Sequence, residues 1–252
     1  MKSMKVEECL KKIREILDVY RLFRSPGGKI VSFPSGKGGV GKTLISLHTG
    51  AALALQNFSV AVVDLNLALP NLHSYVRELP ELTVTHYLTG MCEVEDVKSV
   101  VVRVRDATMH VYPSRSIVDL AKKPDLSKLP SLLSHLKRSY DYILLDLPPG
   151  MTKYSTYPIS LSDCVFVVTA DEKASYLDAT KLAKTLELSG IRIAGYIVNK
   201  YEGRRSVNLD RVAGTIPFDE SIRKFPDVWS KRYFRPKFLK KVMEFAYEVS
   251  RC

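Results

Sequence analysis

The sequence predicts an α/β protein with a single doubly wound, mostly parallel sheet and helices on both faces. Three observations predict this fold class. Short apolar runs alternate with longer segments of helical periodicity along the chain, which is typical of strands joined by crossover helices. A glycine-rich octapeptide separates the first run from the helix that follows it. Polar residues follow the ends of several runs, at the sheet edge where such folds bind ligands.

Length and composition favour one domain. A chain of 252 residues with 46% hydrophobic and 26% charged residues has enough material for a full-sized core. No repeat or linker-like tract divides it, so we assign 29–252 to one domain and 1–28 to an N-terminal amphipathic helix with its linker. No apolar run approaches the about 18–20 residues of a membrane-spanning helix. Charges interleave the N-terminal apolar residues, unlike in a secretory signal.

The cysteines and the charge balance bear on compartment and partners. Cys9, Cys92, Cys164 and Cys252 are scattered without a C-x-x-C pair, so we expect reduced thiols in a cytoplasm and no zinc or iron–sulfur scaffold. The net charge of +11 favours an anionic partner. Nucleic acid, an anionic membrane face and an acidic protein all stay open. A single glutamine and abundant Lys and Arg lean toward a thermophilic source.

The elements follow in order. An amphipathic helix is expected at 4–23, where apolar residues recur at three- and four-residue spacing, and the Ser-Pro-Gly-Gly run at 25–28 ends it. The expected strands, each an apolar run typical of burial on both faces, are 29–33, 60–63, 142–145, 164–168 and 191–198. The expected helices of the domain are about 42–56, 127–138, 174–189 and 236–250.

The octapeptide after the first strand fits the phosphate-binding pattern G-x-x-x-x-G-K-[ST]. It consists of Gly36, Lys37, Gly38, Gly39, Val40, Gly41, Lys42 and Thr43. Consecutive glycines let backbone N–H groups turn inward around phosphate oxygens, and the following helix adds its positive dipole end. We expect all eight residues to bind a nucleotide. Lys42 should reach the β- and γ-phosphates, and the Thr43 hydroxyl should hold Mg²⁺.

The extra lysine of this loop, Lys37, makes it resemble the deviant Walker A motif of the MinD/ParA ATPases. The resemblance spans roughly residues 29–250 and lies closest to the Mrp/MinD branch. It implies a P-loop NTPase fold, ATP and Mg²⁺ as cofactors, and a nucleotide-dependent homodimer. In that family the second lysine reaches the phosphates of the partner subunit, where a cation stabilises the charge of phosphoryl transfer. The resemblance therefore implies a catalytic role in trans for Lys37.

A carboxylate ends the third expected strand. Asp146 is followed by Leu-Pro-Pro-Gly, and a carboxylate in this place can hold Mg²⁺ through water, as a Walker B aspartate does. The Asp-x-Pro-Pro-Gly string also resembles the Mrp/MinD branch. The amide of Gly150 is expected near the γ-phosphate, where it would sense hydrolysis.

The segment after the second expected strand departs from the family pattern. It begins at Asp64, a candidate nucleotide-site residue, and resembles the family's second acidic segment, which usually carries Asp at its first and third positions. Here the third position is Asn66. An amide can orient a water molecule but cannot accept its proton. We therefore expect Asn66, with Lys37 and Lys42, to support a weak ATPase. Two alternatives stay open: another group replaces the missing carboxylate, or the protein senses ATP and rarely hydrolyses it.

Two segments are candidates for the nucleobase. Asn199 ends the fifth expected strand, and the resemblance implies that its amide reads the adenine edge. A guanine reading is also open, since Asn199-Lys200-Tyr201-Glu202 is one residue type away from N-K-x-D. The loop type favours adenine. The Ile-Pro-x-Asp segment around Pro217 resembles the family segment that lies near the base.

The basic stretch 222–241 carries interleaved aromatic residues. Two interpretations of this stretch stay open. An anionic surface, DNA or membrane, could bind there, or the aromatic side chains belong to the core and the charged groups are solvated. The last helix is expected to be the domain's own, without a separate membrane-targeting tail.

The sequence therefore predicts an ATP-dependent dimerising switch with slow hydrolysis that positions or recruits a protein partner of unknown identity. Two alternatives stay open: a hydrolysis-deficient nucleotide-sensing scaffold, and a ParA-like non-specific DNA-binding ATPase. The expected location is cytoplasmic, with a peripheral position at the membrane or the nucleoid left open.

Overall fold

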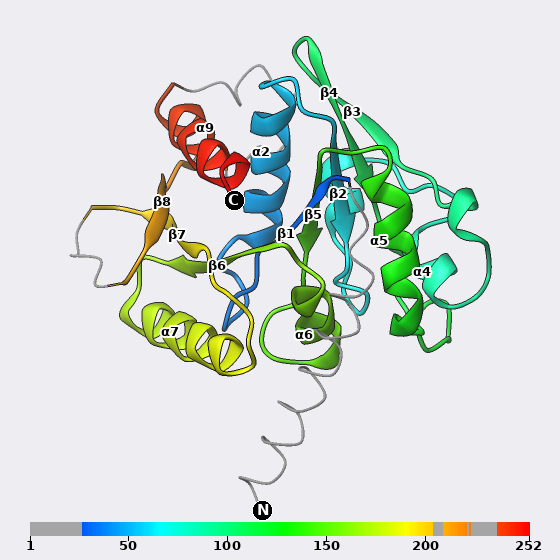
Figure 1. Ribbon diagram of the computed structural model, residues 1–252. Helices are drawn as coiled ribbons and strands as arrows, with labels where there is room; N and C mark the ends of the chain where they lie inside the picture. The colour runs from blue at the N-terminus through cyan, green and yellow to red at the C-terminus, as the bar shows by residue number, and fades with distance from the viewer. Residues whose placement is uncertain (1–26, 204–208, 221, 223–235) are drawn as a thin grey trace, which may run out of the picture.

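Eight strands form one sheet in the computed structural model, which describes residues 27–203, 209–220, 222 and 236–252 (Figure 1). The strand order is β3-β4-β2-β5-β1-β6-β7-β8. The strands are β1 (Lys29–Ser32), β2 (Val60–Asp64), β3 (Val100–Val104), β4 (Ala107–Tyr112), β5 (Tyr142–Asp146), β6 (Cys164–Ala170), β7 (Gly195–Tyr201) and β8 (Val212–Pro217). Every neighbouring pair is parallel except β3 and β4, so the predicted fold class is confirmed.

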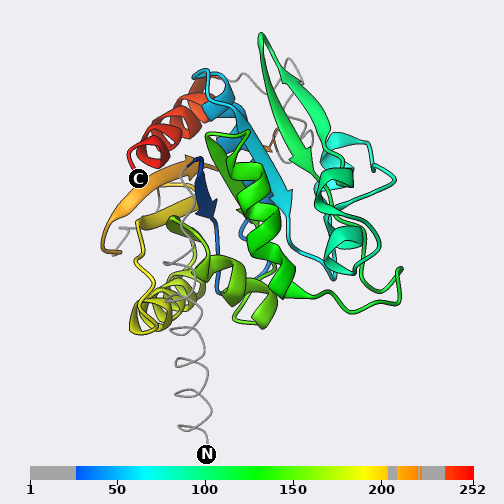
Figure 2. The same cartoon turned by 45° about the vertical axis from the view of Figure 1, so that its right-hand side comes forward.

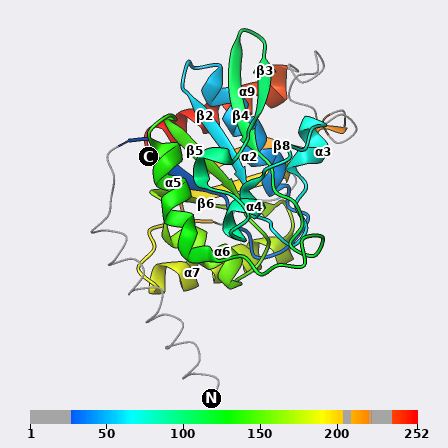
Figure 3. The same cartoon turned by 90° about the vertical axis from the view of Figure 1, so that its right-hand side faces the viewer.

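Helices cover both faces of the sheet. One face packs against α2 (Lys42–Ala54) and α9 (Pro236–Ser250), and the other against α5 (Leu129–Lys137), α6 (Lys153–Ser160) and α7 (Lys173–Leu188). Figure 3 shows the two groups on opposite sides of the strands. The short helices are α3 (Leu72–Val76) and α4 (Val84–Leu88), with 3-10 turns η1 (Val94–Asp96) and η2 (Leu126–Lys128).

The central strands are mostly apolar, and each is buried on both sides. In β5, Tyr142 and Leu144 join the core beneath α2 and α9, while Ile143 and Leu145 join the core beneath α5 and α7. This alternation follows the two-residue period of a strand. On the α9 side, Phe245 packs edge-on against Phe166 at 5.1 Å between ring centroids. The last helix thus belongs to the domain core, as the sequence predicts.

The structure differs from the sequence prediction in several elements. The fifth expected strand begins at Gly195 rather than at 191, because 191–194 forms the connection from α7. The antiparallel hairpin β3–β4, strand β8 and helices α3, α4 and α6 are additional. Figure 2 shows the hairpin projecting beyond the rest of the sheet. The expected helix at 4–23 lies outside the described residues, so the division at residue 28 stays a prediction.

A disulfide joins Cys164 at the start of β6 to Cys252 after α9, and Cys92 is a free thiol. The expectation of reduced thiols is therefore wrong for Cys164 and Cys252. The bond closes a separation of 88 residues and ties the end of α9 to the sheet. Among the described residues, no helix combines the length and the apolarity that crossing a bilayer requires.

The disulfide predicts a redox-dependent stability. Cys252→Ser should lower the free energy of unfolding by about 2–4 kcal/mol, because an unbridged chain regains conformational freedom in the unfolded state. Chemical denaturation with and without reductant measures this, and the difference should vanish in the reduced samples. Cys92→Ser, at the free thiol, is the control and should change little. Equal stability of Cys252→Ser and wild type in oxidising buffer would contradict the prediction.

Candidate nucleotide-binding site

The glycine-rich loop connects β1 to α2 at the carboxyl edge of the sheet. Gly39 (φ 76°) and Gly41 (φ 93°) adopt left-handed backbone conformations that favour glycine. A Cβ on Gly41 would overlap the Asn199 side chain, and one on Gly36 would lie 2.8 Å from the Asp178 Cβ of α7. The loop can therefore take this course only because its sequence supplies glycine where other elements press against it.

The backbone N–H groups of this loop are open. Within the described part of the chain, the amides from Gly38 to Thr43 donate to no protein acceptor. They lie at the start of α2, whose dipole places partial positive charge at the same point. Such a row of unpaired donors fits the oxygens of a phosphate chain.

Lys42 folds over the loop. Its Nζ donates to the Ser35 hydroxyl at 3.0 Å, and the residue is only 8% exposed. Burial lowers the pKa of this ammonium, while the negative charge of Asp146 opposes the shift. Because its described hydrogen-bond partner is a neutral hydroxyl, the buried Lys42 ammonium can still bind an anion such as phosphate. Ser35 is a site residue that the sequence motif does not include.

Thr43 and Asp146 form the metal side of the site. The Thr43 hydroxyl donates to Asp146 Oδ2 at 2.7 Å, whereas Asp146 Oδ1 is buried and has no hydrogen-bond partner among the described residues. Burial raises the pKa of Asp146 to about 6, and the Thr43 hydrogen bond and Lys42 oppose this shift. Mg²⁺ prefers carboxylate and hydroxyl oxygens. These residues fit Mg²⁺, because the unpartnered Asp146 Oδ1 would then serve as a metal ligand.

Asp64 lies beside Asp146, since the β2–β5 register pairs the two residues. It is fully buried and its carboxylate accepts the backbone N–H groups of Asn66, Asn71 and Leu72. Burial raises its pKa well above the ordinary value, the charge of Asp146 adds to this, and the amide bonds oppose it. Asp64 therefore fixes the turn into α3, and its direct contact with nucleotide stays a prediction.

Amide side chains face the cleft beside the metal residues. Asn66 lines it, and its Nδ2 donates to Leu69 O at 2.7 Å. Asn71 also lines it, and its Oδ1 lies 3.3 Å from the Thr43 hydroxyl oxygen. The sequence prediction missed Asn71, although it lies in the same segment as Asn66. The approach of this segment to Thr43 depends on the turn that Asp64 holds.

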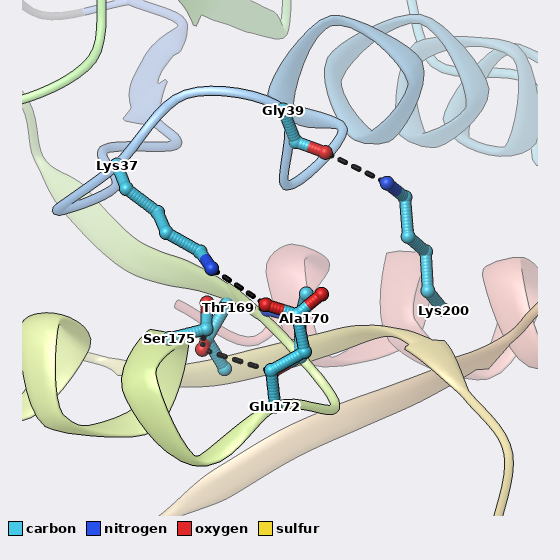
Figure 4. A network of polar contacts seen from close by, with 7 residues as sticks. All are labelled: Lys37, Gly39, Thr169, Ala170, Glu172, Ser175 and Lys200. Atoms are coloured by element: carbon cyan, nitrogen blue, oxygen red, sulfur yellow. Dashed lines mark hydrogen bonds and ion pairs between the residues drawn. The ribbon is translucent and has the colours of Figure 1, made fainter.

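Two predicted site residues have other contacts here. The Gly150 amide donates to Ser35 O at 2.9 Å. It would have to break this hydrogen bond before it could donate to the γ-phosphate. Lys37 Nζ pairs with Glu172 Oε2 at 2.6 Å, with the two side chains 35% and 62% exposed. Figure 4 shows Lys37 extending from the loop toward Glu172 at the start of α7. Lys37 is absent from the described lining of the cleft.

The cleft itself has a volume of about 600 Å³ and runs from Thr43 to the end of β7. Asn199, Pro217, Phe218 and Asp219 line its far end. Asn199 Nδ2 donates to Val40 O at 2.8 Å, which leaves its Oδ1 as the available acceptor for a base. Glu202, the last residue of the guanine-like motif, does not line the described cleft. This placement favours the adenine reading.

Comparisons with known proteins agree with this geometry. The family model AAA_31, an AAA domain, matches residues 28–193. The chain is 28% identical over 201 residues to the septum site-determining protein MinD of Bacillus subtilis, covering 78% of this chain and 72% of that protein. It is also similar in structure to the cell division ATPase MinD of Pyrococcus furiosus, with a TM-score of 0.77 and 28% identity over 89% of this chain and 99% of that one. For MinD of Pyrococcus horikoshii complexed with Mg-ADP, the TM-score is 0.78 and the identity 26%, over 89% and 96%.

The raised pKa of Asp146 predicts a pH-dependent stability. A carboxyl whose folded pKa is about 6 against 3.8 destabilises the fold as pH rises between these values, because the unfolded chain releases its proton first. Asp146→Asn should therefore raise the free energy of unfolding of the nucleotide-free protein by up to about 3 kcal/mol above pH 7, and by about half of that at pH 5.

The same variant should lose the stabilisation that Mg²⁺ and nucleotide give together, because its amide carries no charge. Thermal melts across pH, with and without both ligands, measure the two effects. Asp119→Asn, on an exposed loop, is the control. A variant less stable than wild type at every pH would contradict the assignment of Asp146 as a buried carboxylate destabilised by desolvation.

Proposed function

Because the chain belongs to the AAA_31 family and to the MinD/ParA group of P-loop ATPases, we propose that it is an ATP-driven switch that dimerises on ATP and recruits a partner. ATP and Mg²⁺ are its cofactors. The open amide row beside the Thr43–Asp146 pair carries the proposal, because it joins an anion cradle to a metal site.

In the proposed complex the triphosphate lies along the amides of 38–43 with Lys42 against its outer phosphates. The base extends toward Asn199 and Pro217 at the far end of the cleft. Thr43 and Asp146 hold Mg²⁺, which supplies positive charge to the phosphates. Since Lys42 is buried with only the Ser35 hydroxyl as its described partner, phosphate binding also satisfies its charge.

Dimerisation requires Lys37 to change partners. In the single subunit it pairs with Glu172, and in the proposed dimer it reaches the phosphates of the facing subunit. Exposed ion pairs of this kind contribute only about 0–1 kcal/mol. A desolvated phosphate across the interface offers a stronger interaction. The exchange is therefore favourable only when ATP fills the facing site.

Hydrolysis in this proposal is slow because Asn66 stands where a carboxylate would accept the proton of the attacking water. Its Nδ2 already donates to Leu69 O, so its oxygen is left to orient that water. A hydrolysis-deficient nucleotide sensor is the second candidate, and the same asparagine favours it.

The proposed location is cytoplasmic, where an ATP-driven switch finds its substrate. A disulfide such as Cys164–Cys252 fits that location in a hyperthermophile, whose intracellular proteins are disulfide-rich. The partner is a protein of unknown identity, and DNA or a membrane face is an additional candidate through 222–241. Most of that stretch lies outside the described residues.

Lys37→Ala should bind ATP with near wild-type affinity yet remain monomeric, because the lysine acts across the interface rather than in its own site. Light scattering with ATP, with ADP and without nucleotide measures the mass, and calorimetry measures binding. Lys123→Ala, on an exposed loop, is the control. A wild-type mass that is the same in all three conditions would refute the dimer.

Asn66→Asp should raise steady-state phosphate release by roughly tenfold or more, since general-base assistance contributes typically 10²–10⁴-fold when fully placed. The affinity for ATP should change little. Asn57→Asp, on the turn after α2 and away from the site, controls for added charge. Unchanged turnover would show that Asn66 does not limit hydrolysis and would favour the non-hydrolysing sensor.

Glu172→Gln should strengthen the ATP-bound dimer by up to about thirtyfold, because the two Lys37 side chains of the dimer no longer leave two ion pairs of about 0–1 kcal/mol each. Analytical ultracentrifugation with a slowly hydrolysed ATP analogue gives the dimer dissociation constant. Glu187→Gln, at the far end of α7, is the matched control. Weaker dimerisation of Glu172→Gln would mean that Glu172 serves the interface itself.

A further inference from the structure

Adjacent residues at the end of β7, which both line the cleft, donate hydrogen bonds to the glycine-rich loop. Asn199 Nδ2 donates to Val40 O at 2.8 Å, and Lys200 Nζ donates to Gly39 O at 2.8 Å. Figure 4 shows the Lys200 side chain reaching the Gly39 carbonyl. The two acceptors belong to consecutive peptide units of the loop.

These contacts determine where the loop's N–H groups point. A trans peptide is planar, and its C=O and N–H point in opposite directions. A donor that holds the Gly39 carbonyl therefore turns the Val40 N–H in the opposite direction. The Val40 carbonyl and the Gly41 N–H are related in the same way. Both amides belong to the row that has no protein acceptor among the described residues.

The backbone at Lys200 is unusual for a lysine in a strand. Its φ is 56°, in the left-handed region that residues other than Gly, Asn and Asp rarely adopt. The β7–β8 ladder is also irregular between Val198 and Tyr201. Irregularities of this kind re-aim a side chain and gather at functional sites. A solvated lysine on a regular strand would need neither feature.

We propose that Lys200 is a positioning residue of the ATP site, which acts through the Gly39 carbonyl to hold the Val40 N–H toward the phosphates. It touches the loop rather than the reacting atoms. Asn199 does the same for the Gly41 N–H, and this contact is independent of any contact it makes with the base. The inference rests on the proposed ATP-binding function.

Lys200→Met keeps the length of the side chain and removes its donor, so the affinity for ATP–Mg²⁺ should fall about five- to tenfold, as for a lost hydrogen bond from a charged group that is partly exposed. Lys200→Arg retains a donor and should stay within about twofold of wild type. Lys123→Met controls for the loss of one positive charge. Isothermal titration calorimetry measures all of them.

Lys200→Gly separates positioning from folding. Glycine relieves the left-handed backbone, so the melting temperature should rise while the affinity for ATP–Mg²⁺ falls as in Lys200→Met. A merely structural lysine would move both quantities in the same direction. Ala121→Gly, at another left-handed position (φ 49°), should gain stability without changing affinity.

Wild-type affinity in Lys200→Met and Lys200→Gly would overturn the inference and leave the proposed function standing. An equal loss in Lys123→Met would also overturn it, since the effect would then come from net charge. If the wild-type protein itself gives no heat with ATP–Mg²⁺, the proposed function fails first and the inference with it.

Discussion

The structure depends on one arrangement, the separation of carbonyls from amides in the glycine-rich loop. The carbonyls of Lys37, Gly39, Val40 and Gly41 accept hydrogen bonds from the protein, given by the Ser35 hydroxyl, Lys200, Asn199 and the Ile45 amide. The amides of 38–43 are left without protein acceptors among the described residues. An unpaired N–H group is unfavourable unless water or a ligand satisfies it. The fold thus holds in place a site that an anion completes.

The charges beside the loop follow the same logic. Burial raises the pKa of Asp64 and Asp146 and lowers that of Lys42, so each charged form is disfavoured unless a ligand compensates it. In the proposed complex, phosphate pairs with the Lys42 ammonium and Mg²⁺ with the Asp146 carboxylate, and together they remove this penalty. The register of β2 and β5 places the acids side by side, and the metal then offsets their repulsion. In the proposed complex, nucleotide binding and metal binding are therefore coupled through this shared cluster.

Most of the sheet and the loop could be predicted from the sequence because their signals are local. Apolar runs identify β1, β2, β5 and β6, and the octapeptide by itself identifies a phosphate-binding loop. The sequence prediction missed the hairpin β3–β4. In β3, Val100, Val102 and Val104 are buried while Val101 and Arg103 are exposed, but Val101 is as apolar as its neighbours, so the sequence shows this alternation only in part. The remaining features come from tertiary contacts. The partners of Lys37, Lys200 and Cys252 lie 135, 161 and 88 residues away in sequence, and no local pattern identifies them.

Two lysines, Lys37 within the loop and Lys200 beside it, differ in whether a ligand can replace their hydrogen-bond partners. Lys200 is bonded to a backbone carbonyl, which every state of the loop retains, so its contact can persist through the nucleotide cycle. Lys37 is bonded to an exposed carboxylate, and a phosphate can replace that partner. The difference lies in the acceptors, since the two side chains have the same chemistry. In the proposed function, the Lys200 contact keeps the loop in shape within one subunit, whereas Lys37 exchanges its carboxylate partner for a phosphate of the second subunit.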